Sequence, residues 1–178
     1  MLDVALSCGA IRGRDAAKEI AELYLTVAQD VNIEIYYRGG CLRRCWSIAR
    51  SYGLHTLEAQ ARSASYQMAQ LLFKLPEIPT GILLQPFEIL TVNPRCGEFN
   101  DPSRQEVRDL LKQIRFRSAT NVSTLEGVSE LLVRVASTDS ERDKARRSLI
   151  ESYLALGESA KGMIASSYFE EAAGTASK

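Results

Sequence analysis

The sequence has little of what common catalytic and metal-binding motifs require. Its 178 residues include one histidine and four cysteines. It contains no Walker phosphate loop, no Gly-rich dinucleotide fingerprint after a clear strand and no paired zinc motif. A single histidine excludes schemes that need two imidazoles, and four cysteines are too few for the disulfide scaffold of a small secreted protein. The sequence therefore predicts no metal and no other cofactor, and it favours a function without catalysis.

Long apolar runs and a surplus of one charge are also missing. No run approaches the about 20 residues of a membrane span, and the first residues lack a basic-then-apolar leader. We therefore expect no membrane segment and a cytoplasmic protein with reduced thiols. Lys plus Arg and Asp plus Glu both number 22. This balance excludes a surface that is basic throughout, so any nucleic-acid site would be a local patch.

The apolar periodicity predicts a mainly α fold, either a compact multi-helix bundle or a short α-solenoid with a minor extended element. A short helix is expected over Cys41–Tyr52, with Gly53 as its terminator. The clearest helix is expected over Thr56–Leu75, capped by Thr56 and closed by Pro76. Its apolar positions share one face and are expected in the core: Leu54, Leu57, Ala61, Ala64, Met68, Leu71, Leu72 and Leu75.

Two capping boxes predict a helical hairpin in the C-terminal part. The motifs Ser123-x-x-Glu126 and Thr138-x-x-Glu141 each open an apolar periodic stretch, and the second stretch is expected to end at Gly157. So short a link predicts antiparallel helices with a turn near Thr138. A weaker helix is expected over Ser159–Ala173, followed by a frayed tail.

The first forty residues leave an alternative open. Leu2–Leu6 and Val31–Tyr37 alternate apolar and polar residues as strands do, and Asp15 can cap a helix between them. Such an N-terminal βαβ unit would make the fold α/β, although Leu2–Leu6 also fits a helix.

The whole chain, residues 1–178, is expected to form a single domain. A Pro-punctuated connection over 76–102 divides it into 1–76 and 102–173. Within that connection, Ile82–Leu84 and Phe87–Val92 are predicted to be extended, at a sheet edge if anywhere, because Pro86 cannot donate to a central ladder.

The segment Asp101–Arg117 is the strongest candidate for a binding surface. On a helix with about 100° per residue, its cations fall on one side and its apolar residues on another. A row of cations facing solvent favours an anionic partner such as RNA or DNA, and a solvated amphipathic face is the alternative. The cations are Arg104, Arg108, Lys112 and Arg115, and the residues expected in the core are Val107, Leu110, Leu111 and Ile114.

A second basic cluster surrounds the only tryptophan. Arg43, Arg44 and Arg50 flank Trp46, which could stack on a nucleobase or anchor the core. In the same segment, the thiols of Cys41 and Cys45 share a helical face. Their spacing matches no common zinc module, so a site built from Cys41, Cys45, His55 and Cys96 is not predicted.

Cys8 and Arg14 have the spacing C-x5-R in a turn between a predicted strand and a predicted helix. This spacing resembles the phosphate-binding loop of cysteine-dependent phosphatases, in which a thiolate attacks phosphorus while the arginine holds its oxygens. The resemblance implies an alternative function, a phosphatase-like enzyme using Cys8 and Arg14. Asp15 stands where that family has a hydroxyl residue.

The leading interpretation is a non-enzymatic interaction or assembly protein. Its helical surfaces would bind a protein partner or a second copy of the chain. Nucleic-acid binding through the basic helix face is the sharper variant of this hypothesis.

Overall fold

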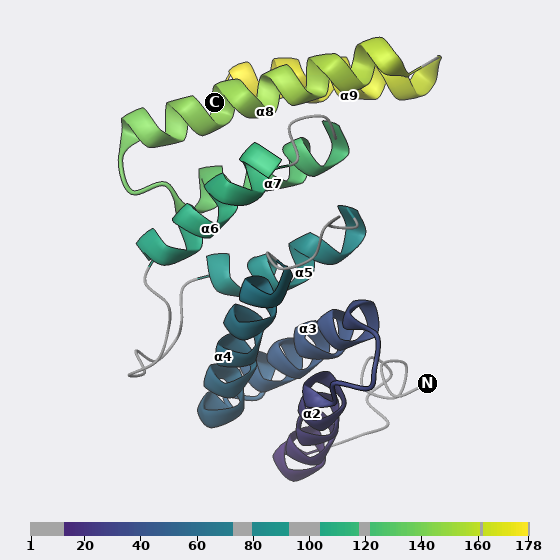
Figure 1. Ribbon diagram of the computed structural model, residues 1–178, viewed down its shortest axis with the longest axis vertical. Helices are drawn as coiled ribbons and strands as arrows, with labels where there is room; N and C mark the ends of the chain where they lie inside the picture. Colours follow the sequence, from purple (N-terminus) through teal and green to yellow (C-terminus); the bar gives the residue numbers. More distant parts are fainter. Residues whose placement is uncertain (1–12, 73–79, 93–103, 118–121, 161, 178) are drawn as a thin grey trace. The chain divides into compact units, whose positions relative to one another are not determined.

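The computed structural model describes residues 13–72, 80–92, 104–117, 122–160 and 162–177 (Figure 1). These residues form eight helices and no strand, so the fold is mainly α, as predicted. The chain divides into two compact units, which we call unit 1 (Met1–Asp101) and unit 2 (Pro102–Lys178). Among the described helices, none is both long enough and apolar enough to cross a membrane.

The described residues of unit 1 form four helices, of which α3 and α4 each pack against the other three (Figure 1). They are α2 (Arg14–Gln29), α3 (Ile35–Ser51), α4 (His55–Leu72) and α5 (Thr80–Thr91). Helix α3 packs against the other three, and α4 also packs against α2 and α5. All four contribute to one buried cluster, which includes Ala17, Tyr24, Leu42, Cys45, Leu57, Met68 and Ile89. Unit 1 is therefore a bundle with a shared core.

The predicted strand Val31–Tyr37 is wrong. Asp30 begins a turn in which its Oδ1 accepts a hydrogen bond from the backbone N–H of Asn32 at 2.9 Å, and its carbonyl accepts one from Ile33. This local bonding is typical of aspartate in turns, and it leaves Val31 78% exposed. Helix α3 then begins at Ile35, six residues before the predicted start at Cys41, and continues through Gly39 and Gly40. The βαβ alternative thereby loses one strand, and Leu2–Leu6 lies outside the described residues.

The core face expected for α4 is largely confirmed. Leu57, Met68 and Leu72 are buried, whereas Leu71 is 41% exposed. The helix begins at His55, so Thr56 lies in its first turn instead of capping it. The expected terminator before α4 is confirmed, because Gly53 has a φ of +65°.

Helix α4 also buries polar residues that hold α5 in place. Arg62 is 3% exposed, and its Nη1 donates to the carbonyls of Ile89 at 2.7 Å and Val92 at 2.8 Å. These carbonyls lie at the C-terminal end of α5, where no intrahelical donor remains. The guanidinium of Arg62 therefore supplies the missing donors.

The prediction of extended structure around Pro86 is wrong. Residues 80–91 form α5, with Pro86 inside the helix. Proline costs a helix interior about 3 kcal/mol. Phe87, Ile89 and Leu90 are at most 4% exposed, and full burial of each such side chain contributes about 1.5–3 kcal/mol. Burial against α3 and α4, together with the bonds from Arg62, outweighs the effect of the proline.

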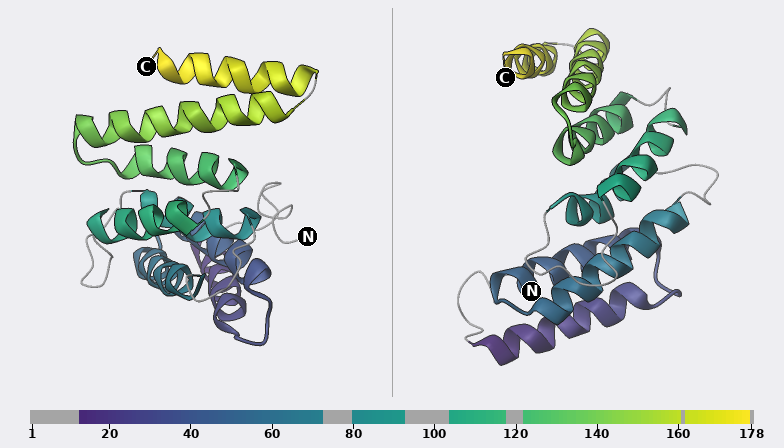
Figure 2. Two further views of the ribbon diagram at one scale, coloured as in Figure 1. Left: turned by 45° about the horizontal axis from the view of Figure 1, so that its top comes forward. Right: turned by 90° about the vertical axis from the view of Figure 1, so that its left-hand side faces the viewer.

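In unit 2, helices that follow each other in sequence pack side by side. They are α6 (Arg104–Arg117), α7 (Val122–Val135), α8 (Asp139–Ser159) and α9 (Met163–Ala176). Packing joins α6 to α7, α7 to α8 and α8 to α9. Figure 2 shows α7, α8 and α9 as successive layers. This serial arrangement is typical of an α-solenoid.

The hairpin formed by α7 and α8 is confirmed at its turn. The hydroxyl oxygen of Thr138 accepts a hydrogen bond from the backbone N–H of Glu141 at 3.2 Å, which caps α8. The expected start at Ser123 is slightly wrong, since α7 already includes Val122.

The expected end of α8 at Gly157 is also wrong, because the helix continues to Ser159. A Cβ atom on Gly157 would lie 2.7 Å from Cε1 of Phe169, so this glycine gives room to α9 instead of terminating α8. The weaker helix expected after it is present as α9 and continues to Ala176, beyond the predicted end at Ala173.

Candidate anionic-partner interface

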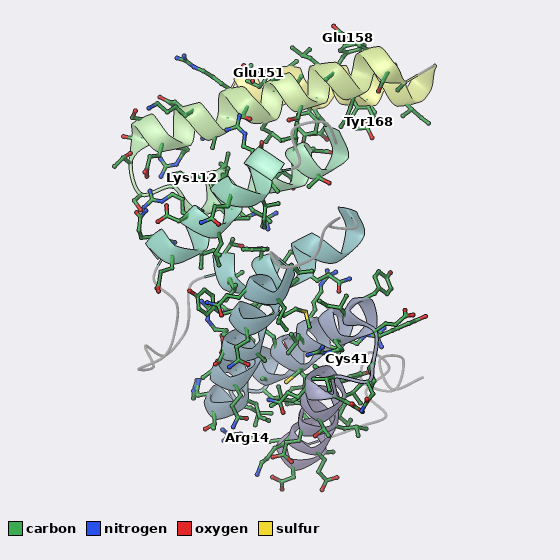
Figure 3. The ribbon with its side chains drawn as sticks, viewed as in Figure 1. Arg14, Cys41, Lys112, Glu151, Glu158 and Tyr168 are labelled. Carbon is green, nitrogen blue, oxygen red and sulfur yellow. The ribbon has the colours of Figure 1, made fainter. Side chains whose placement is uncertain are left out.

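The basic segment of unit 2 is helical, as predicted, and its apolar face is buried with one exception. Val107, Leu111 and Ile114 are at most 1% exposed. Leu110 is only half-buried. On the basic side, Arg104 and Lys112 are exposed and Arg115 is half-buried. Figure 3 shows Lys112 on α6.

The exposure expected for Arg108 is wrong. This side chain is 6% exposed, and its guanidinium donates hydrogen bonds to Glu141 on α8 and to Gln105 on α6. Arg108 lies three positions before the buried Leu111, at the edge of the buried face, and from there its side chain reaches Glu141 on α8. Glu141 also accepts a hydrogen bond from the backbone N–H of Ser137, and this bond and the Arg108 charge lower the pKa of the Glu141 carboxyl. Arg108 is therefore engaged inside unit 2.

The loss of Arg108 breaks the continuity of the expected cationic row. Its neighbours on α6 also have partners. The Nζ of Lys112 lies 3.9 Å from a carboxylate oxygen of Asp109. As a docking surface for a polyanion, α6 therefore presents separated cations beside a carboxylate.

Unit 1 presents a second candidate, an open groove of about 890 Å³ along α3. The described residues that line it belong to α3 and its C-cap Tyr52, with Gln85 from α5. Its basic and aromatic members are Tyr36, Tyr37, Arg43, Arg44 and Tyr52, and we call it the α3 groove.

Charge is distributed unevenly along α3. The helix carries four arginines and no Asp or Glu in its 17 residues. Two of the four have structural roles, since Arg38 Nε donates to the Ala28 carbonyl at 2.8 Å and Arg50 binds the buried Glu58 at 2.8 Å. The other two, Arg43 and Arg44, line the groove.

The two groove arginines are positioned by weak contacts. Arg43 Nε lies 3.2 Å from Glu88 Oε2, and both side chains are more than one third exposed, at 59% and 37%. Exposed pairs of this kind contribute about 0–1 kcal/mol. Arg44 Nη1 donates to the hydroxyl of Tyr24 at 3.3 Å, and its guanidinium carbon lies 5.7 Å from the ring centroid of the same tyrosine. Arg44 is therefore held in a defined direction by Tyr24.

The aromatic residues of the groove are its tyrosines. Tyr36 and Tyr37 are 49% and 62% exposed, their ring centroids are 5.5 Å apart, and the rings stand at 84° to each other. Tyr52 is 37% exposed at the other end of α3. Trp46, by contrast, packs against the core and is covered by the guanidinium of Arg50 at 5.4 Å. Of the two roles considered for Trp46, the core anchor is the one observed.

Cys41 lies in the same groove (Figure 3). Burial raises the pKa of its thiol, and the nearby Arg44 charge opposes that rise only in part. Burial raises the pKa of the neighbouring Cys45 thiol to about 12. Thiols with raised pKa values are poor nucleophiles and poor metal ligands at neutral pH. In the described ranges, no three His, Cys, Asp or Glu side chains gather as metal ligands, and Cys96 lies outside those ranges.

Arg14, one of the two residues of the phosphatase resemblance, is at the start of α2 (Figure 3). Its Nη2 donates to the carbonyl of Gly53 at 3.0 Å, which ties α2 to the turn between α3 and α4. Asp15 lies in the first turn of α2, and Gly13 occupies the N-cap position where Asp15 was expected. Cys8 lies outside the described residues.

Only part of the α3 groove was predicted from the sequence. The arginines around Trp46 were noticed, but Tyr36 and Tyr37 were assigned to a strand and so were separated from them. The available signal was a stretch with four arginines, no carboxylate and a tyrosine near each end. Comparisons of the chain with protein-family models, with curated proteins and with solved structures find no match.

Proposed function

We propose that this chain is a non-enzymatic helical binding module that takes up an anionic partner in the α3 groove. The observation that carries the proposal is that Arg43 and Arg44 line a groove with exposed tyrosines, on a helix without a carboxylate. Guanidinium groups bind phosphate and carboxylate oxygens through two parallel hydrogen bonds. The groove therefore matches a partner that carries repeated negative charge.

The existing contacts of both arginines are compatible with exchange for a ligand. The pair between Arg43 and Glu88 is exposed, and its small contribution can be offset by a multiply charged anion. Arg44 contacts Tyr24 through a hydrogen bond to the hydroxyl and through the ring face, and a bound anion would compete with contacts of this kind. The α6 stripe, Arg104, Arg108, Lys112 and Arg115, is the weaker site because Arg108 is buried on Glu141.

The test is binding of a fluorescently labelled single-stranded oligonucleotide, with unlabelled polyphosphate as a competitor without bases. Two phosphate contacts give a slope of log affinity against log salt of about −1.4, so affinity falls about sevenfold between about 50 and 200 mM salt. The double variant Arg43→Gln, Arg44→Gln is expected to abolish most of this binding. The matched variant Arg104→Gln, Lys112→Gln removes the same charge from α6 and is expected to bind as the parent does.

Two results would contradict the proposal. One is a parent protein that binds neither anion at low salt. The other is loss of binding in the α6 variant with full binding in the α3 variant, which would return the site to the basic stripe. Thermal unfolding of both variants controls for loss of fold.

Self-association is a second candidate, favoured by the surface of α8 and α9. Leu154, Ile164 and Phe169 are 41, 63 and 44% exposed. A contiguous apolar patch marks a surface suited to protein contacts, and these side chains are where such a patch is tested. Light scattering should then show a mass that rises with concentration and falls in Ile164→Ser. A parent protein that stays monomeric at high concentration would remove this candidate.

The enzymatic alternative uses Cys8 and Arg14 as nucleophile and phosphate ligand. It predicts hydrolysis of p-nitrophenyl phosphate that is lost in Cys8→Ser. An inactive parent protein would exclude it under those conditions.

A further inference from the structure

We infer that the anionic partner of the α3 groove is single-stranded nucleic acid whose unstacked bases lie on the groove tyrosines. This inference rests on the proposed function, and it adds a second kind of contact to the charge contacts. The groove combines phosphate ligands with exposed aromatic faces, which is the combination that single-strand binding uses. An anion without bases would engage only the arginines.

The aromatic surface is concentrated beside the arginines. Tyr36 and Tyr37 precede Arg43 and Arg44 by about two helical turns, or about 11 Å along the axis. Their rings stand at 84° to each other, so their faces point in different directions and each can receive its own base. More than half of Tyr37 and about half of Tyr36 is exposed, at 62% and 49%. Stacking on them therefore needs no unfolding of the helix.

The length of the groove fits a short stretch of one strand. Tyr36 and Tyr52 are sixteen positions apart, which corresponds to about 24 Å at the rise of an α-helix. That length accommodates a few nucleotides of a strand whose bases are unstacked. Arg43 and Arg44 lie between the two ends, where the backbone of such a strand would pass.

A duplex does not match these contacts as well. Its bases are already stacked and paired, so their faces are hidden from a protein side chain on the surface. Exposed tyrosines would then contribute nothing beyond the arginine contacts. An acidic peptide would likewise use the arginines, without the base faces that stack on the rings.

The decisive experiment tests the contribution of the tyrosine rings separately from that of the arginine charges. The labelled strand, about 16 nucleotides of oligothymidine, is bound to the parent, to Tyr36→Leu with Tyr37→Leu, and to Tyr36→Phe with Tyr37→Phe. The leucine variant keeps apolar side chains but loses the ring faces, and we expect its affinity to fall about tenfold. The phenylalanine variant keeps the rings and is expected to bind within about twofold of the parent. Polyphosphate should displace the bound strand equally well from all three proteins when the same fraction of each protein is bound, because it contacts only the arginines.

A direct measurement places the strand in the groove. Cys41 lies among the groove residues, so a bound strand is expected to slow its alkylation. The reaction is run at an alkaline pH at which the free protein is labelled measurably, and peptide mass mapping identifies the labelled cysteine. Protection should be lost in Arg43→Gln with Arg44→Gln. Labelling of Cys41 that is unchanged by saturating strand would overturn the inference even if binding is observed.

The outcomes distinguish the two proposals. Equal binding of the strand by the parent and the leucine variant, or tighter binding of a duplex or of polyglutamate than of the strand, would overturn base stacking while anion binding stands. Failure of the parent to bind strand, polyphosphate and polyglutamate would overturn the proposed function together with this inference.

Discussion

The two units bury their amphipathic helices in different ways. In the described part of unit 1, α3 and α4 each contact the other three helices, and one core joins side chains from all four. In unit 2, the packing proceeds from each helix to the next. A shared core makes the helices of unit 1 depend on one another, whereas serial packing lets a helix at the end loosen by itself.

The interfaces differ in chemistry as well. The α7–α8 contact includes small polar side chains, with Ser129 Oγ and Ser148 Oγ at 3.3 Å, and both residues are buried. Small hydroxyl side chains permit close approach, and their hydrogen bonds satisfy the buried polar atoms. In unit 1 the corresponding centre is filled by Leu42, Met68 and Ile89, each at most 2% exposed.

The largest effect is expected from Met68→Asp in unit 1. Met68 is 2% exposed within the shared core, and an unpartnered buried carboxylate costs several kcal/mol. Hydrogen exchange should show loss of protection in α2, α3, α4 and α5 together. Protection lost in α4 alone would break the description of unit 1 as one cooperative bundle.

A matched change in unit 2, Ala172→Asp, should have a smaller and local effect. Ala172 is 4% exposed and packs with Leu149 and Tyr153 where α9 meets α8. We expect about 2 kcal/mol of destabilisation, because α9 can detach and hydrate the new carboxylate. Hydrogen exchange should show α9 opening while α7 stays protected. Simultaneous opening of α6 to α9 would mean that unit 2 is as cooperative as unit 1.

The sequence predicted the elements that depend on local signals. The period of α4, the cap at Thr138 and the glycine stop at Gly53 are each readable within a few residues. The α7–α8 hairpin follows from two such signals placed close together. These features were correct because their causes are contained in the segments themselves.

The errors arose where distant side chains decide the outcome. Helix α5 exists because its apolar residues are buried on α3 and α4 and its last carbonyls are bound by Arg62, neither of which is visible around Pro86. Arg108 is buried because Glu141, 33 positions later, reaches it. The candidate site shifted from α6 to α3 for the same reason, since a helical projection shows which residues share a face but not which face meets a neighbour.

The cap of α8 gives a moderate and specific test of unit 2. Thr138→Ala removes the acceptor of the Glu141 N–H, and we expect a loss of about 1 kcal/mol in unfolding free energy. Thr138→Ser keeps the acceptor and should stay close to the parent in a urea unfolding series. Under serial packing, the loss should appear as earlier exchange in the first turn of α8. An alanine variant as stable as the serine variant would contradict the role of the cap.

The smallest effect is expected at Glu126 on α7. Here the substitution should stabilise the protein, whereas the three substitutions above should destabilise it. Burial, and then the charges of Glu130 and Glu171, raises the pKa of the Glu126 carboxyl. A carboxyl whose folded pKa is raised opposes folding at neutral pH, and this opposition disappears as the pH falls through that pKa. Glu126→Gln should therefore slightly raise the unfolding midpoint at pH 7, with the gain fading as the parent carboxyl becomes protonated in acid. Glu141 has a lowered pKa, so its own stabilisation of unit 2 is present above its unfolded pKa and is lost as the pH falls through the folded one.

The matched control for Glu126→Gln is Glu151→Gln, which removes the same charge from an exposed position of α8 and should leave the midpoint close to the parent (Figure 3). Thermal unfolding from pH 4 to pH 7 measures all three proteins, and a Glu126→Gln variant less stable than the parent at pH 7 would show that this carboxylate stabilises the α7 to α9 layers instead of straining them.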